Sequence, residues 1–231
     1  MKKAIVLFNL GGPDKLENVE PFLFNLFYDP AILNLPKFIR YPLAKLISKR
    51  RAPIAKKIYK EIGGSSPILK LTNDQAVKLE NSLNSNQKDI IYRTFVAMRC
   101  WNPRTSQIVK EVRKFNPAEV ILLPLYPQYS ATTSGSSINE WKEICKIENF
   151  NVKTSTFCCY PTDNSFIDAH INEIKKRSTN LISEEHCMRR DLRLAKTAKK
   201  NPNDLGFFRA KVPGVFSLLW GFFKKAEIFG F

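Results

Sequence analysis

The amino-acid sequence predicts an α/β fold in which a mostly parallel sheet is flanked by helices. Four short segments are rich in Ile, Val, Leu, Phe and Thr, as strands are, at residues 4–8, 89–98, 119–125 and 152–157. Apolar residues at helical spacing mark residues 53–62, 72–83, 103–115, 134–148 and 163–177. This alternation is typical of a parallel sheet, and a chain of 231 residues with 44% hydrophobic residues can bury a core without disulfides.

The first predicted strand follows two lysines, an arrangement that also begins secretory signal peptides. Lys2 and Lys3 precede the apolar run AIVLFNL, which is short and ends in GGPD without a small-residue cleavage site. The pattern favours a buried strand followed by a turn. A second apolar run, residues 212–223, is too short for a transmembrane helix, which needs about 20 residues.

The positive charge of the chain is concentrated in one region. The formal charge is +16, and residues 30–60 contain nine basic residues and no acid. On a helix, one half of residues 38–47 would be apolar, formed by Phe38, Ile39, Pro42, Leu43, Leu46 and Ile47. Pro36 and Pro42 predict a short, bent element rather than one long helix.

Three interpretations of this basic and apolar segment stay open. It could be a solvated charged surface, its apolar half could pack on the protein's own core, or it could contact a membrane surface. Membrane contact gains from apolar insertion and from about 1 kcal/mol for each Lys or Arg near anionic lipid. The large aliphatic side chains argue against a nucleic-acid arm, so no nucleic-acid partner is expected.

In a parallel sheet the ligand crevice lies beyond the carboxyl ends of the strands. The sequences that follow the first three predicted strands are NLGGP (9–13), RCWNP (99–103) and YPQYSATTSGSS (126–137). Neither GxGxxG nor GxxxxGK[ST] is present, so nucleotide binding is only weakly indicated. Asn102 and Pro103 predict a helix cap followed by a first-turn proline.

Glycine, a cation, aromatic rings and hydroxyls at one edge suit a large, flat and partly apolar anion. Arg99 could hold a carboxylate of such a ligand, or it could form a structural ion pair. Tyr126 and Tyr129 could bind the ligand, or they could be packing residues. The five cysteines contain no CxxC pair and there are two histidines, so neither a disulfide framework nor a metal site is expected.

Together these segments resemble the ferrochelatase family, which catalyses the last step of haem synthesis. The resemblance covers residues 4 to about 177 and rests on NLGGP (9–13), SKRRAP (48–53), IYKEIGGSSPI (58–68), the surroundings of Arg99 and, above all, YPQYSATTSGSS (126–137). It implies a chelatase-like α/β domain, the first of two that enclose a porphyrin cleft. It also implies insertion of ferrous iron into protoporphyrin IX to form protohaem. No iron-sulfur cluster or other resident cofactor is expected, because the cysteines lack suitable spacing.

The resemblance also implies a set of cleft residues. By motif match, the side chains that would contact or line the porphyrin cleft are Arg51, Tyr59, Ser66, Leu10, Arg99, Tyr126 and Ser130. Arg51 is the natural partner of a propionate. The region matching residues 23–47 would form an apolar lip that touches the membrane, in agreement with its basic and apolar composition. A cytoplasmic protein held peripherally on the inner face of the membrane is therefore expected.

No catalytic residue is matched. Ferrochelatases place a catalytic histidine in a Ser-Ala-His-Gly/Ser-Leu-Pro motif beyond the point that corresponds to residue 177, and a partner glutamate in the second domain; neither motif occurs here. His186 lies near the expected place in EEHCMRR, without a following Leu-Pro, and receives no role. His170 is predicted to lie on a helix surface. The alternative function is therefore a truncated, inactive fragment that at most binds porphyrin or an anionic membrane surface.

The composition changes at Ser178, where strand and helix patterns stop. The sequence predicts two regions: a ferrochelatase-like α/β domain at residues 1–177 and a divergent basic and aromatic tail at residues 178–231, which is not a native domain. A shifted reading frame or inserted foreign sequence near residue 178 is the simplest hypothesis for the tail.

Overall fold

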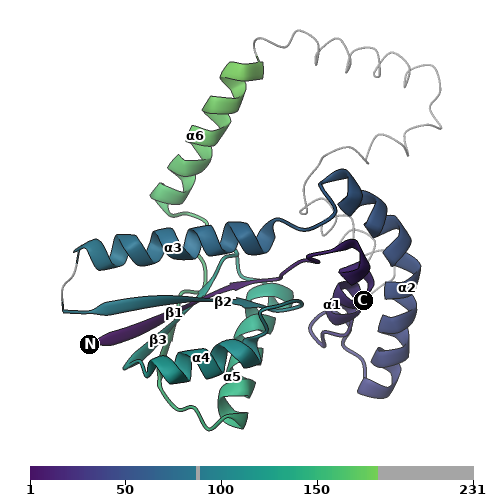
Figure 1. Ribbon diagram of the computed structural model, residues 1–231, viewed down its shortest axis with the longest axis horizontal. Coiled ribbons are helices and arrows are strands. Elements are labelled where there is room, and N and C mark those ends of the chain that lie inside the picture. Colours follow the sequence, from purple (N-terminus) through teal and green to yellow (C-terminus); the bar gives the residue numbers. More distant parts are fainter. Residues whose placement is uncertain (87–88, 182–231) are drawn as a thin grey trace. The chain divides into compact units, whose positions relative to one another are not determined.

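The computed structural model of the chain describes residues 1–86 and 89–181 (Figure 1). Its elements in chain order are β1 (Lys2–Asn9), the 3₁₀ helix η1 (Leu16–Asn18), α1 (Val19–Phe27), α2 (Lys37–Glu61), α3 (Ile68–Asn86), β2 (Ile91–Met98), α4 (Thr105–Phe115), β3 (Glu119–Pro124), the π-helical turn η2 (Ala131–Gly135), α5 (Ser136–Ile147), β4 (Lys153–Thr156) and α6 (Asn164–Leu181).

The chain divides into two compact units, Met1–Asp163 and Asn164–Phe231, so α6 is described by itself. His170 is exposed on α6, as the sequence predicts. The predicted domain boundary at residue 177 stays a prediction. From residue 182 onward, the expected divergent tail lies outside the described residues, as does His186.

The four strands form one parallel sheet in the order β2-β1-β3-β4. The central strand β1 pairs with β2, where Lys2 lies opposite Ile91, and with β3, where Lys3 lies opposite Glu119. The predicted α/β fold class and the positions of all four strands are thereby confirmed. The carboxyl ends of the strands meet at one edge, called the carboxyl edge below.

Helices of the first unit cover the two faces of the sheet (Figure 1). On one face, Ala4, Val6 and Phe8 pack with α4 and α5, and the ring of Trp141 meets Phe8 edge-on at 6.0 Å. On the other face, alternate residues of β1 and β2 pack with α3, chiefly Ile5, Leu7, Val96 and Met98. Alternation of side chains across the strands explains why each helix contacts every second residue.

Helix α2 corrects the prediction of a short, bent element. It is one helix of 25 residues that includes both Pro42 and Pro53. Its buried residues recur every four positions and are Arg40, Ala44, Ser48 and Ala52. The small side chains of this stripe let α2 pack closely along α1. Each proline removes one backbone hydrogen bond from α2, and the packing on α1 stabilises the helix in spite of that loss.

Three further local features differ from the sequence-based expectation. Helix α1, which includes Pro21, was not predicted. The residue that caps α4 is Arg104, not Asn102, and Pro103 lies before the helix. The helix predicted from residue 134 begins with the π-helical turn η2, whose cap residue Ser130 accepts a hydrogen bond from the backbone of Thr132.

Candidate functional site

The loops that follow β1 and β2 are joined at the carboxyl edge by backbone hydrogen bonds. The N–H of Arg99 donates to Asn9 O at 2.9 Å, and the N–H of Cys100 donates to Leu10 O at 2.8 Å. The Ser66 N–H donates to Pro13 O at 2.8 Å. The structure therefore brings the segments of three predicted residues, Leu10, Ser66 and Arg99, to one edge. The Leu10 side chain itself is buried.

Two glycines allow these loops to approach so closely. Gly11 has a φ of +87°, and a Cβ there would lie 3.0 Å from Trp101 Cβ. A Cβ on Gly12 would lie 2.5 Å from Ser66 Cβ and closer still to its hydroxyl oxygen. Only glycine fits at either position. The motif NLGGP is thus a packing motif that sets the place of Ser66.

Ser66 opens onto a pocket of about 490 Å³. Most of its lining residues have polar side chains, and they are Asp14, Ser65, Ser66, Leu69, Lys70, Asn73 and Asp74. Asp14 was not among the residues predicted from the sequence. Its carboxylate accepts hydrogen bonds from Asn18 at 2.7 Å and from the Trp101 indole at 3.2 Å. The Asn18 bond, aided by the Trp101 bond, lowers the pKa of Asp14.

The loop after β3 carries Tyr126 and Ser130. Burial raises the pKa of Tyr126, and the nearby Arg99 charge opposes this shift. Among the described residues, the Tyr126 hydroxyl has no hydrogen-bond partner. Ser130 is half-buried and caps η2. The hydroxyl of Tyr129 lies 2.9 Å from the position that a Cβ on Gly135 would occupy. Tyr129 therefore packs on the same turn.

Arg99 is held by the protein's own carboxylates. Its guanidinium lies 3.1 Å from Asp29 and 3.0 Å from Glu140, and its side chain is 12% exposed. The structure thus shows the ion pair that the sequence left open for this residue. Contact of Arg99 with a porphyrin stays a prediction.

Arg51 and Tyr59 lie eight residues apart on α2. Partial burial lowers the pKa of Arg51 and raises the pKa of Tyr59. The end of α2 leads directly to Ser66, because the N–H of Gly64 donates to Tyr59 O at 2.7 Å in the intervening turn. Gly63 and Gly64 both have positive φ in that turn. Three residues of the motif match are therefore linked through one short turn.

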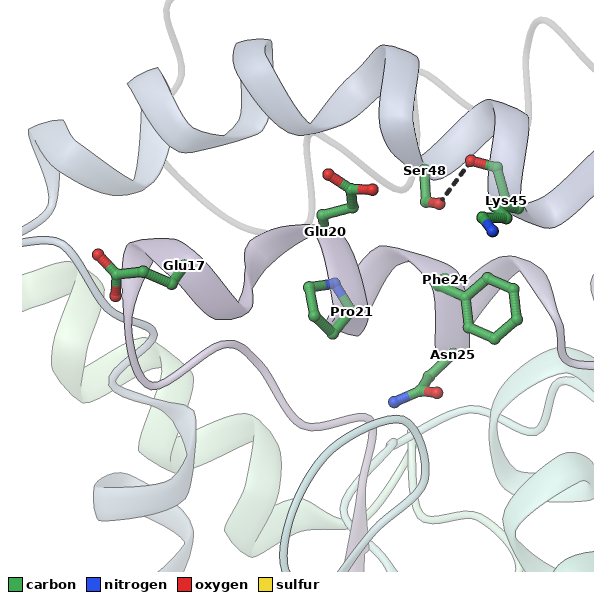
Figure 2. A pocket seen from close by; sticks show the side chains of 7 residues that line it. All are labelled: Glu17, Glu20, Pro21, Phe24, Asn25, Lys45 and Ser48. Carbon is green, nitrogen blue, oxygen red and sulfur yellow. Dashed lines mark hydrogen bonds between the residues drawn. The ribbon is translucent and has the colours of Figure 1, made fainter.

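A second pocket, of about 380 Å³, lies between α1 and α2 (Figure 2). Its lining residues are Glu17, Glu20, Pro21, Phe24, Asn25, Lys45 and Ser48. In Figure 2, Glu20 points toward α2, and Ser48 donates a hydrogen bond to Lys45 O at 3.0 Å. Glu17 and Glu20 were not among the residues predicted from the sequence. A spacing of three residues would place both side chains on one side of a helix, but helix α1 was not predicted from the sequence.

The outward surface of α2 is basic and apolar. Phe38 is 77% exposed and Ile54 is 65% exposed, and Ile39, Tyr41 and Leu46 are also exposed. The interpretation that the apolar half of residues 38–47 packs on the protein's own core is therefore wrong for most of that half. The residues of α2 that are buried instead include Arg40 and Ala44. The surface that combines these side chains with the lysines and arginines of α2 is called the α2 outer face below.

Two kinds of feature are absent from the described residues. No three histidine, cysteine, aspartate or glutamate side chains of residues 1–86 and 89–181 come together where they could hold a metal ion. In the same ranges, no helix has the length and apolar character needed to cross a membrane.

Comparison with known proteins agrees with this geometry. The family model "Ferrochelatase" matches residues 2–191, a span that runs past the predicted boundary at residue 177. The chain is 67% identical over 181 residues to a ferrochelatase of Pelagibacter ubique (strain HTCC1062), covering 78% of this chain and 53% of the relative.

More distant relatives give the same result. Identity is 51% over 176 residues to a ferrochelatase of Wolbachia sp. subsp. Drosophila simulans (strain wRi), with 76% of this chain and 56% of the relative covered. It is 49% over 175 residues to one of Rickettsia bellii (strain OSU 85-389), with 75% and 48% covered. The chain spans about half the length of the curated relatives it matches. Over the part that is matched, this chain belongs to the ferrochelatase family.

Proposed function

We propose that this chain acts as a ferrochelatase, inserting ferrous iron into protoporphyrin IX to form protohaem. The family match over residues 2–191 carries the proposal, because it includes every segment that meets at the carboxyl edge. Iron enters as a substrate, and the proposal includes no resident cofactor. Iron insertion requires a porphyrin that is held in a fixed orientation and a base that removes its two N–H protons.

The residues of this chain serve the first requirement. We propose that Arg51 binds a propionate, since its guanidinium offers a planar pair of donors to a carboxylate. Tyr59 and Ser66 supply a ring and a hydroxyl at the end of the same helix and its following turn. Leu10, Arg99, Tyr126 and Ser130 complete the proposed wall of the cleft at the carboxyl edge.

We further propose a peripheral contact between the α2 outer face and an anionic membrane, on its cytoplasmic side. Exposed apolar side chains beside lysines and arginines support this proposal, because insertion and charge attraction add together. The contact would place the lip at residues 23–47 where an apolar porphyrin is dissolved. No nucleic-acid partner is part of the proposal.

A second candidate function is porphyrin binding without iron insertion. The absence of the Ser-Ala-His-Gly/Ser-Leu-Pro motif from the sequence favours this candidate, since that motif carries the family's proton-accepting histidine. The wall described above would then bind porphyrin without a base to accept the pyrrole protons.

An anaerobic titration separates the two candidates. The full chain is titrated with protoporphyrin IX, and ferrous iron is then added while porphyrin absorbance is recorded. The proposed activity predicts saturable binding followed by metallation faster than in a protein-free control. Binding with metallation at the control rate supports the second candidate, and the absence of saturable binding contradicts both.

A further inference from the structure

A buried group of charged and hydroxyl side chains surrounds Arg99. The Arg99 Nη2 atom lies 3.1 Å from Asp29 Oδ2, and Nη1 lies 3.0 Å from Glu140 Oε1. Its Nε–H donates to Ser136 Oγ at 2.7 Å. Asp29 follows α1, Arg99 follows β2, and Ser136 and Glu140 belong to α5. One cation therefore joins the ends of three elements.

The partners of Arg99 are themselves fully engaged. Asp29 accepts a hydrogen bond from Ser136 Oγ at 2.5 Å and another from the N–H of Ala31 at 2.9 Å. Glu140 accepts one from Thr105 Oγ1 at 2.6 Å. The Asp29 side chain is 1% exposed. A buried ion pair with all its hydrogen bonds made fixes the geometry of its members, and removing one partner leaves an uncompensated charge.

Helix α1 is attached to the residues after β2 along one of its faces. Asn25 Nδ2 donates to Cys100 O at 3.0 Å, and the Phe22 ring meets the Trp101 ring edge-on at 6.5 Å. With Asp29, these positions follow the three- and four-residue spacing of one helix face. Because α2 packs along α1, the position of α2 also depends on this attachment.

We propose that Asp29, Arg99 and Ser136 are positioning residues. They fix the pair of helices α1 and α2 against the turn η2 at the start of α5. The two parts of the proposed porphyrin wall, Arg51 with Tyr59 on α2 and the loop before η2, would thereby keep their spacing. The identity of the ligand as a porphyrin rests on the proposed function. The fixed spacing of α1 and α2 relative to η2 does not.

Hydrogen exchange tests the fixed spacing in the full chain without any ligand. Asp29→Asn removes the charge that joins Arg99 to α1. The control Glu140→Gln removes a charge that joins Arg99 to α5 and that also pairs with Arg104, before α4, at 3.4 Å. In Asp29→Asn, amides of α1 and α2 are expected to exchange about tenfold faster or more, with β1 and β3 unchanged. In Glu140→Gln, amides of α1 and α2 should exchange as in the wild type.

Ser136→Ala serves if Asp29→Asn does not fold, since it removes one bridging hydroxyl and no charge. It is expected to speed exchange in α1 and α2 by a smaller factor, again with the sheet unchanged. Equal acceleration in Asp29→Asn and Glu140→Gln, or no selective effect of Ser136→Ala on α1 and α2, would overturn the positioning role.

Porphyrin titration of the same variants links the spacing to the ligand. Asp29→Asn should weaken protoporphyrin binding more than Glu140→Gln does, even where both lower the melting temperature equally. Equal weakening would overturn the link between spacing and ligand. If the wild-type chain binds no porphyrin, the proposed function fails, and the exchange experiment still decides the positioning role.

Discussion

Gly12 shows how closely single residues are fitted at the carboxyl edge. Its backbone packs on the Ser66 side chain, so that a Cβ there would lie 2.5 Å from Ser66 Cβ. Gly63 in the next turn differs, because its φ is +95° but a Cβ would meet nothing within 4 Å. The first glycine is required by contact and the second by backbone conformation.

These two glycines give a matched pair of substitutions. Gly12→Ala should lower the free energy of unfolding by about 1–3 kcal/mol through overpacking. Gly63→Ala should lower it by about 1–2 kcal/mol through its left-handed backbone alone. Urea unfolding of both variants measures the two effects.

The cause of the Gly12 effect is tested by a second substitution. In a Ser66→Gly background the clashing atoms are gone, so Gly12→Ala should cost markedly less than it does in the wild type. Gly63→Ala should cost the same in both backgrounds. An unchanged cost of Gly12→Ala would show that the contact with Ser66 is not its cause.

Cys100 predicts a pH dependence of stability. Burial raises the pKa of its thiol to about 12, whereas an unfolded thiol ionises near pH 8.5. The unfolded chain therefore binds fewer protons at alkaline pH, and stability falls as the pH rises between these values. The contribution of Cys100 is about 1.4 kcal/mol for each pH unit in that window.

Comparison with Cys100→Ala isolates this contribution. Other groups that ionise at alkaline pH are present in both proteins, so the difference between the two slopes belongs to Cys100. Urea unfolding between about pH 9 and pH 11 should show the steeper loss in the wild type. Parallel slopes would contradict the buried, protonated thiol.

For single residues, the sequence predicted the kind of contact that a side chain makes better than it predicted which residue lies on the other side of that contact. The motif NLGGP indicated a turn, but nothing in it showed that Gly12 would lie against Ser66. Arg99 was predicted to hold either a ligand or an ion pair, and its partners Asp29 and Glu140 could not be identified, because they lie 70 and 41 residues away along the chain. Long-range partners of this kind depend on the arrangement of whole elements.

At the scale of elements, the strands were predicted correctly because their signal is local. Composition and turn residues located all four strands, and alternation predicted their parallel pairing. Helix α1 was not predicted, and α2 was predicted as a helix only from Pro53 onward, since Pro21 and Pro42 obscure the helical pattern before it. Packing of the small residues of α2 on α1 overrides that local preference, and only tertiary contact reveals it.

The α2 outer face predicts binding to anionic vesicles. Phe38→Ser should weaken binding to vesicles of phosphatidylcholine and phosphatidylglycerol by about tenfold or more, because the ring no longer inserts. Val77→Ser on α3 is the control, since Val77 is 59% exposed on another helix. Neither change should alter the free energy of unfolding by more than about 0.5 kcal/mol.

Vesicle co-sedimentation at low and high salt measures this effect. Binding of the wild type should weaken as salt screens the basic residues. Equal binding by Phe38→Ser and the wild type would contradict a membrane contact through this face.

At the scale of the whole molecule, order and spacing of motifs carried the assignment. No single loop identified a family, whereas five segments in the right order did, and the match at residues 2–191 confirms that reading. The charge of +16 has a physical use in the proposed function, since both propionates and anionic lipids are acidic. The base that accepts the pyrrole protons could not be predicted, because the family's catalytic histidine motif does not occur in the sequence.

The proposed function depends on porphyrin binding by the wall that includes Arg51. Equilibrium titration of the full chain with protoporphyrin IX, read by fluorescence, tests it with Arg51→Ala and the control Lys57→Ala, an exposed basic residue of the same helix. We expect saturable binding by the wild type. Arg51→Ala should weaken it by about tenfold, which corresponds to the loss of one charge-assisted hydrogen bond, whereas Lys57→Ala should leave it nearly unchanged. Absence of saturable binding by the wild type, or equal weakening in both variants, would contradict porphyrin binding by that wall.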